Sequence, residues 1–224
     1  RQRREQRLNQ YWGVDADPTA QGRLKGALPV AVLDIGSNSV RLVVYERHAR
    51  ALTTLYNEKS PAALGRGVAS SGRLAEENMR KALTAIQRFA LVTKLMKVGA
   101  THILATSAVR DAKNRDEFVA AVEAIMGAEV RVLSGTEEAY FASLGVRAGI
   151  PGFSGLVGDL GGGSLELLPM EGETNSTGET HELGVIRLQD DSKLSPAKAR
   201  QLARSRLKNS VVSARKAGGS FCAI

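Results

Sequence analysis

The chain has 224 residues, of which 43% are hydrophobic, and a formal net charge of +8. It can bury one large or two modest cores, but no run of residues approaches the roughly 20 consecutive apolar positions of a membrane span. The basic N-terminus lacks the apolar stretch of a signal peptide, and the single Cys222 excludes an intramolecular disulfide, so we expect a cytoplasmic protein without a membrane partner.

The basic excess lies at the two ends of the chain. Residues 193–216 hold eight basic and no acidic residues, and no aromatic residue is interleaved with them. Because nucleic-acid surfaces combine basic and aromatic side chains, this segment favours a solvated helix face over a nucleic-acid site. A position beside a channel for a long anionic substrate is the other interpretation.

In chain order, residues 1–27 form a polar, basic extension, and a first domain is expected over residues 28–150. The domain begins with three antiparallel strands, a glycine-rich loop and a long amphipathic helix, as the apolar spacing indicates. The expected ranges are 30–33, 40–46 and 52–58 for the strands, 64–72 for the loop and 74–97 for the helix.

A short strand over residues 101–106 delivers residues 107–110 at its C-terminal end, where ligands of open α/β sheets bind. Asn114 and Glu117 have the spacing of a capping box, which predicts a helix over residues 115–126.

A further strand is expected over residues 130–133. Ser134 and Glu137 then repeat the capping-box spacing and predict a helix to about residue 147. Residues 149–155 contain three glycines and indicate a hinge.

The second domain, expected over residues 151–224, repeats a strand, a glycine loop and a strand. A third strand is expected near residues 179–187, and Ser195 followed by Pro196 predicts the start of a helix that runs to about residue 214. A last strand begins at residue 221. This second copy is much shorter than the first, so we expect the second domain to be incomplete.

Two glycine loops are related by an offset of 125 residues. VLDIGSNSVRLVVY at 32–45 aligns with VGDLGGGSLELLPM at 157–170, so that Asp34 matches Asp159. Glycines allow positive φ and a concave run of N–H groups that can hold phosphate, although a hairpin turn can need glycine for steric reasons alone. Walker and Rossmann loops lead into a helix, whereas both loops here lead into alternating strand sequence. The repeat indicates two domains that face one ligand.

Four ordered segments carry a family resemblance: DIGSNSVRLVVYE, ATSAVRDAKNRDEFV, VLSGTEEAYFASLGV and GDLGGGSLEL. In this order and spacing the chain resembles the exopolyphosphatase and guanosine pentaphosphate phosphohydrolase family, within the superfamily of actin-like ATPases and sugar kinases. The resemblance implies an α/β fold with two actin-like (ribonuclease H-like) domains, whose mixed sheets are flanked by helices. It also implies a phosphoanhydride hydrolase that removes terminal orthophosphate from inorganic polyphosphate or from guanosine pentaphosphate.

The resemblance assigns Glu138, the second glutamate of the SGxEE pattern, as the general base that activates water. A structural alternative is open, because an acid in the first turn of a helix is also favoured by the helix dipole. The family further implies Mg²⁺ or another divalent cation at Asp159 and Glu166, whose carboxylate oxygens suit that ion. Asp34 would assist the metal or cap its own turn.

Arg110 is the candidate cationic clamp on a phosphate, with a surface pair to Asp111 or Asp116 as the alternative. The candidate phosphate-binding residues are those of the two loops: Gly36, Ser37, Asn38, Ser39, Gly161, Gly162, Gly163 and Ser164.

Two other functions stay open at this point. One is a regulatory module that binds phosphate or a nucleotide without turnover, and a weaker one is a kinase. If the chain ends at Ile224, the exposed sheet edge would also favour a homodimer.

Overall fold

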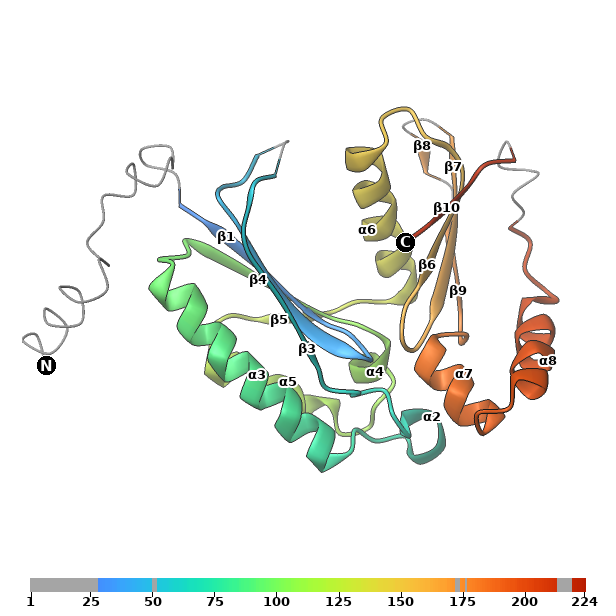
Figure 1. Ribbon diagram of the computed structural model, residues 1–224, viewed down its shortest axis with the longest axis horizontal. Coiled ribbons are helices and arrows are strands. Elements are labelled where there is room, and N and C mark those ends of the chain that lie inside the picture. Colours follow the sequence, from blue (N-terminus) through green and yellow to red (C-terminus); the bar gives the residue numbers. More distant parts are fainter. Residues whose placement is uncertain (1–27, 50–51, 172–173, 176, 213–218) are drawn as a thin grey trace, which may run out of the picture.

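A computed structural model describes residues 28–49, 52–171, 174–175, 177–212 and 219–224. The extension expected over residues 1–27 therefore lies outside the described residues. Figure 1 shows two β-sheets, each accompanied by helices, with α6 between them. Both sheets mix parallel and antiparallel pairs, so the expected α/β class with mixed sheets flanked by helices is confirmed.

The first sheet has the strand order β3-β2-β1-β4-β5. The central β1 pairs antiparallel with β2 and parallel with β4, so the first three strands form a meander and the last two arrive by crossover connections. The strands are β1 (Val30–Ile35), β2 (Ser39–Tyr45), β3 (Thr54–Pro61), β4 (Ala100–Ala105) and β5 (Val130–Val132).

Two helices, α3 (Glu76–Leu95) and α5 (Arg115–Met126), lie side by side against this sheet (Figure 1). The apolar residues of α3 recur every three or four positions, which places them on one stripe facing the strands. Ile86, Phe89 and Phe118 are almost completely buried there. This core fixes the sheet as a rigid support for the loops at the ends of β1 and β4.

The second sheet has the order β10-β6-β7-β8, and β9 also pairs with β7. Its elements are β6 (Ser154–Leu160), β7 (Leu165–Glu171), β8 (Thr174–Asn175), β9 (Glu179–His181) and β10 (Phe221–Ala223). The expected strand at residue 221 is thus confirmed, and it pairs parallel with β6.

The helix α6 (Gly135–Gly149) packs against the second sheet, although it precedes that sheet in the chain. Ala139 and Val146 of α6 share a core with Val157, Leu168 and Met170 of β6 and β7. The domain boundary expected at residue 150 stays a prediction, and we propose to count α6 with the second sheet.

The third strand expected near residues 179–187 is only partly present. β9 ends at His181, and the helix α7 (Val185–Ser192) begins four residues later. The N–H groups of Val185 and Ile186 donate to the carbonyl oxygens of Gly161 and Gly162 at 3.0 and 2.8 Å. These tertiary hydrogen bonds hold the first turn of α7 in place. The periodicity of the sequence does not predict them.

Helix caps were predicted with mixed success. The box of Ser134 and Glu137 is confirmed at the start of α6. The box of Asn114 and Glu117 is wrong, because the Asn114 amide instead accepts the Leu74 N–H at 2.8 Å and donates to the Leu74 carbonyl at 3.1 Å.

Ser195 caps α8 (Pro196–Leu207) with proline at N1 as expected, but the helix ends earlier than residue 214. The loop expected over residues 64–72 contains a short helix, α2 (Val68–Ser71). None of the helices in the described part of the chain combines the length and the apolar composition that crossing a bilayer requires.

Candidate active site

The two glycine hairpins have the same turn. The Gly36 N–H donates to the Ser39 carbonyl at 3.0 Å, and the Gly161 N–H donates to the Ser164 carbonyl at 3.0 Å. Within the described residues, the N–H groups of Asn38 and Gly162 donate no hydrogen bond to a backbone carbonyl, so they are candidates for contact with a ligand. The repeat read from the sequence is therefore also a structural repeat.

The expected reason for the loop glycines is wrong, since none of Gly36, Gly161, Gly162 and Gly163 adopts a positive φ. At Gly162 and Gly163 glycine is required instead by the close approach of the second loop to Ser37 and Ser107. A Cβ atom at Gly163 would lie 2.4 Å from Ser107 Oγ and 2.7 Å from Ser37 Oγ. These two buried hydroxyl groups are themselves 2.8 Å apart. The loops of the two sheets thus touch each other.

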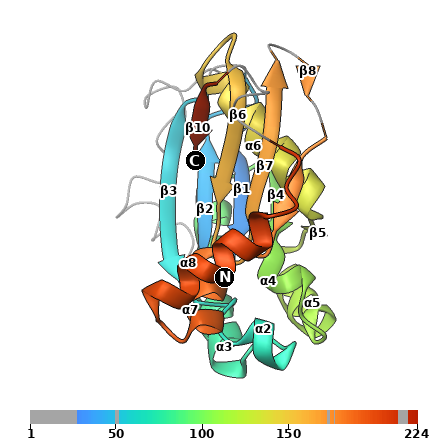
Figure 2. The same cartoon turned by 90° about the vertical axis from the view of Figure 1, so that its right-hand side faces the viewer.

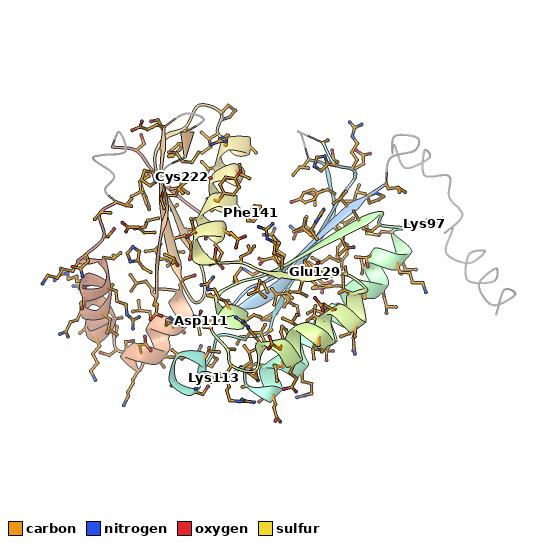
Figure 3. The ribbon with its side chains drawn as sticks, turned by 180° about the vertical axis from the view of Figure 1, so that it is seen from behind. Lys97, Asp111, Lys113, Glu129, Phe141 and Cys222 are labelled. Carbon is orange, nitrogen blue, oxygen red and sulfur yellow. The ribbon has the colours of Figure 1, made fainter. Side chains whose placement is uncertain are left out.

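A cavity of about 670 Å³ is lined by residues of both sheets and of these loops. The phosphate-loop candidates line it with the exception of Gly163, which is buried behind Ser107. Phe141 of α6 lines it as well, and Figure 3 shows this ring between α6 and the first sheet. The cavity has room for several phosphate groups, so both loops can contact one extended anion.

Four carboxyl groups line the cavity: Asp34, Glu138, Asp159 and Glu166. Asp159 and Glu166 lie directly opposite each other on β6 and β7. Burial raises the pKa of Glu166 to about 7, with the Glu138 charge adding to the rise and hydrogen bonds from Ser164 and Thr180 opposing it. The Thr180 hydroxyl donates to Glu166 Oε1 at 2.9 Å.

Burial also raises the pKa of two further carboxyl groups in the cavity, Asp159 and Asp34. Burial, and then the Glu138 charge, raises the pKa of Asp159. Burial, and then the Asp159 charge, raises the pKa of Asp34 to about 6. Asp34 is exposed to solvent, whereas Glu166 is only 4% exposed, so loss of solvation acts more strongly on Glu166 than on Asp34. Crowded carboxylates of this kind favour a bound cation.

The donor set fits a magnesium ion. Asp159 and Glu166 offer hard oxygen atoms from facing positions, and the cavity leaves room for water and phosphate oxygens, which complete most protein Mg²⁺ sites. Among the described residues no group of three or more His, Cys, Asp or Glu side chains is arranged to hold a metal ion, so Asp159 and Glu166 would need water or phosphate oxygens as further ligands. The metal role of these two residues stays a prediction.

Arg110 belongs to the short helix α4 (Ser107–Arg110) and does not line the cavity. Its Nη1 group donates to Glu138 Oε2 at 3.0 Å and to the Leu133 carbonyl at 2.9 Å, and its Nε atom lies 3.4 Å from Asp111 Oδ1. The predicted clamp on phosphate is untested, but in this geometry the guanidinium orients Glu138. The alternative pairing with Asp111 is present at the same time.

Several cavity residues were not selected from the sequence. Lys59, Arg66 and Thr106 line the cavity, and Arg41, which we had considered only as a strand-face charge, lines it as well. The position of Thr106 after β4 was a usable signal, because residues at strand ends reach ligands. Lys59 and Arg66 had none, since isolated basic residues are common on any surface.

Comparisons with known proteins agree with the resemblance. Residues 43–220 match the Ppx/GppA phosphatase family. "Exopolyphosphatase 2" of Mycobacterium tuberculosis is 33% identical over 170 residues, which cover 71% of this chain and 53% of the relative. The chain therefore spans about half the length of the curated relatives it matches.

Solved structures give the same result. An exopolyphosphatase from Cytophaga hutchinsonii superposes with a TM-score of 0.76 at 25% identity, over 87% of this chain and 66% of that one. The Ppx/GppA family member of Aquifex aeolicus has a TM-score of 0.66 at 26% identity, over 81% and 61% of the two chains.

Proposed function

The chain belongs to the Ppx/GppA phosphatase family, and from this premise we propose that it forms the catalytic cleft of a hydrolase that removes terminal orthophosphate from inorganic polyphosphate. One observation carries the proposal: Glu138 faces the same cavity as the two glycine loops and the opposed pair of Asp159 and Glu166. A water-activating base, anion-binding loops and a cation site are the parts that phosphoryl transfer to water requires.

In this proposal the free N–H groups of the loops hold the oxygens of the terminal phosphate, in place of solvent. Glu138 accepts a proton from a water molecule whose oxygen attacks the terminal phosphorus. The bridging P–O bond breaks on the opposite side, so orthophosphate leaves and the chain becomes one unit shorter. A divalent cation, when bound, neutralises charge on the transferred phosphoryl group.

The substrate is proposed to be a long polyanion because basic side chains line the same cavity as the acids. Arg41, Lys59 and Arg66 belong to it, and Arg41 and Lys59 lie opposite each other on β2 and β3. Guanosine pentaphosphate is the second candidate, since it presents the same terminal phosphoanhydride. We propose that either reaction takes place in the cytoplasm.

The test is the release of orthophosphate from long-chain polyphosphate and from guanosine pentaphosphate, assayed in parallel with Mg²⁺ for the full-length protein and two variants. Glu138→Gln should lower kcat by roughly 10²–10⁴-fold, the contribution of a general base, while substrate still binds. Glu137→Gln is the matched control, because Glu137 serves the helix cap and glutamine can replace glutamate there.

The faster substrate would identify the reaction. Full activity in Glu138→Gln would refute the role of Glu138 as base. Binding of both substrates without release by the unmodified protein would instead support the regulatory module.

A further inference from the structure

The helix α7 connects the second glycine loop to the first domain. Its first-turn N–H groups bind the carbonyl oxygens of Gly161 and Gly162. The next residue, Arg187, reaches toward the first sheet, where its Nη2 group donates to Asp111 Oδ2 of the segment after α4 at 2.7 Å. Figure 2 shows α7 at the lower end of the second sheet, and Figure 3 shows Asp111 beside it. One short helix thus holds both the loop and a first-domain carboxylate.

Asp111 forms ion pairs with two guanidinium groups at once. Its Oδ2 atom faces Arg187, and its Oδ1 atom lies 3.4 Å from Arg110 Nε. Arg110 in turn contacts Glu138 through Nη1 at 3.0 Å. The result is a continuous row of alternating charges that runs from α7 to the carboxylate facing the cavity.

We propose that Arg187 is a positioning residue for the hydrolysis, which holds the pair of Arg110 and Glu138 in register with the glycine loop at 161–164. This inference rests on the proposed function, in which Glu138 is the base. The side chain of Arg187 is only 11% exposed and has a second carboxylate partner, Glu182, at 2.8 Å, so its orientation is determined by packing and charge.

Removal of Arg187 changes the competition for Arg110. Asp111 would lose its nearer cation and would draw the Arg110 guanidinium toward itself, away from Glu138. A base displaced by about 1 Å from its attack geometry can lose about 100-fold in rate. Because neither Arg187 nor Arg110 lines the cavity, the effect should fall on kcat rather than on KM.

The kinetic test compares Arg187→Gln, Arg187→Lys and Arg206→Gln in the full-length protein. Arg206 of α8 is the matched control: it pairs with Asp191 of α7 at 2.5 Å and donates to the Glu182 carbonyl, but among the described residues it contacts neither Asp111 nor Arg110. We expect Arg187→Gln to lower kcat about tenfold, the equivalent of about 1.4 kcal/mol, with KM unchanged. Lysine, which retains one ion pair to Asp111, should restore part of the loss.

An unchanged kcat in Arg187→Gln, an equal loss in Arg206→Gln, or a rise in KM alone would overturn the proposal. Asp111→Asn combined with Arg187→Gln supplies a second route, because this double variant has neither an unpaired Asp111 charge nor a carboxylate that draws Arg110 away from Glu138. Its kcat should lie close to that of the unmodified protein, and a kcat at least tenfold lower would count against the row of charges.

A second measurement needs no turnover. The side-chain Nε–H resonance of Arg110, assigned by its loss in Arg110→Lys, should shift in Arg187→Gln and stay in place in Arg206→Gln. A resonance that does not move in Arg187→Gln refutes the link between the two arginines. If the unmodified protein releases no phosphate, the proposed function fails, and this resonance still decides whether Arg187 orients Arg110.

Discussion

Asp34 in the first glycine hairpin lies opposite Arg41 on the neighbouring strand, whereas Asp159 in the second lies opposite Glu166. The turns are the same, with one N–H to carbonyl bond of 3.0 Å in each. The first hairpin thus presents a carboxylate with its own cation, and the second presents two carboxylates. The two hairpins therefore share one backbone turn but differ in their electrostatic environment, and the environment of the second hairpin is the one that favours a metal ion.

The two hairpins also differ in what supports them. In the first, the carbonyl oxygens of Ser37 and Asn38 accept N–H groups from the loop at residues 62–65. In the second, the carbonyl oxygens of Gly161 and Gly162 accept N–H groups from the start of α7. The second loop is therefore tied to a helix that also contacts the first domain, so a change in α7 should reach the chemistry more directly.

The largest effect should come from removing the carboxylate of one hairpin at a time. Asp159→Asn removes a proposed metal ligand and should lower Mg²⁺-dependent turnover about 100-fold, the equivalent of about 2.7 kcal/mol. Asp34→Asn, whose charge is partly balanced by Arg41, should cost about tenfold or less. Titration of activity against Mg²⁺ measures both, and equal losses would remove the distinction between the hairpins.

Packing against the second loop should dominate stability. A Cβ atom at Gly184 would lie 2.2 Å from backbone atoms of Gly163, which cannot yield, whereas a Cβ atom at Gly161 meets nothing closer than 3.6 Å. Gly184→Ala should therefore destabilise the protein by about 1–3 kcal/mol, the usual cost of overpacking. Gly161→Ala is the control for thermal unfolding. A normal melting temperature in Gly184→Ala would contradict the close packing of the start of α7 against the second loop.

The pH dependence of stability should separate the two hairpins. The pKa of Glu166 is raised from 4.5 to about 7, so native Glu166 retains a proton between these values that the unfolded chain has released. The free energy of unfolding without metal should therefore fall as the pH rises from 4.5 to 7. For Asp34, raised from 3.8 to about 6, the window is lower.

Thermal melts of Glu166→Gln and Asp34→Asn between pH 4 and pH 8 measure these slopes. Glu166→Gln should flatten the upper window and Asp34→Asn the lower one. A slope in Glu166→Gln equal to that of the unmodified protein would show that its carboxyl group is not desolvated.

The smallest effect on stability is expected at the contact between α7, which supports the second hairpin, and the residues that follow the loop at 62–65, which supports the first. Asp190 of α7 pairs with Arg66 at 2.6 Å and accepts the Gly67 N–H at 2.8 Å. Because Arg66 is about half exposed, Asp190→Asn should cost no more than about 1 kcal/mol of stability. A much larger loss in denaturant unfolding would mean that this contact, and not α7 packing, holds the domains together.

The sequence by itself determined what depends on near neighbours. The duplicated turn follows from glycine and serine at fixed spacing. The helix starts at Ser134 and Ser195 follow from serine side chains that accept the N–H group three residues later. Alternating apolar residues likewise predicted the strands on both sides of each loop, since a strand's two faces repeat every second residue. All of these are interactions within a few positions of the chain.

The tertiary structure decided the contacts between distant residues. It turned Arg110 toward Glu138, 28 positions away, and brought Arg187 to Asp111, 76 positions away. It also formed the start of α7 where a strand had been expected, and packed it against a loop more than twenty residues earlier in the chain. Residue types alone do not specify which of many arginines meets which carboxylate, because that choice is made by the packing of two sheets and α6.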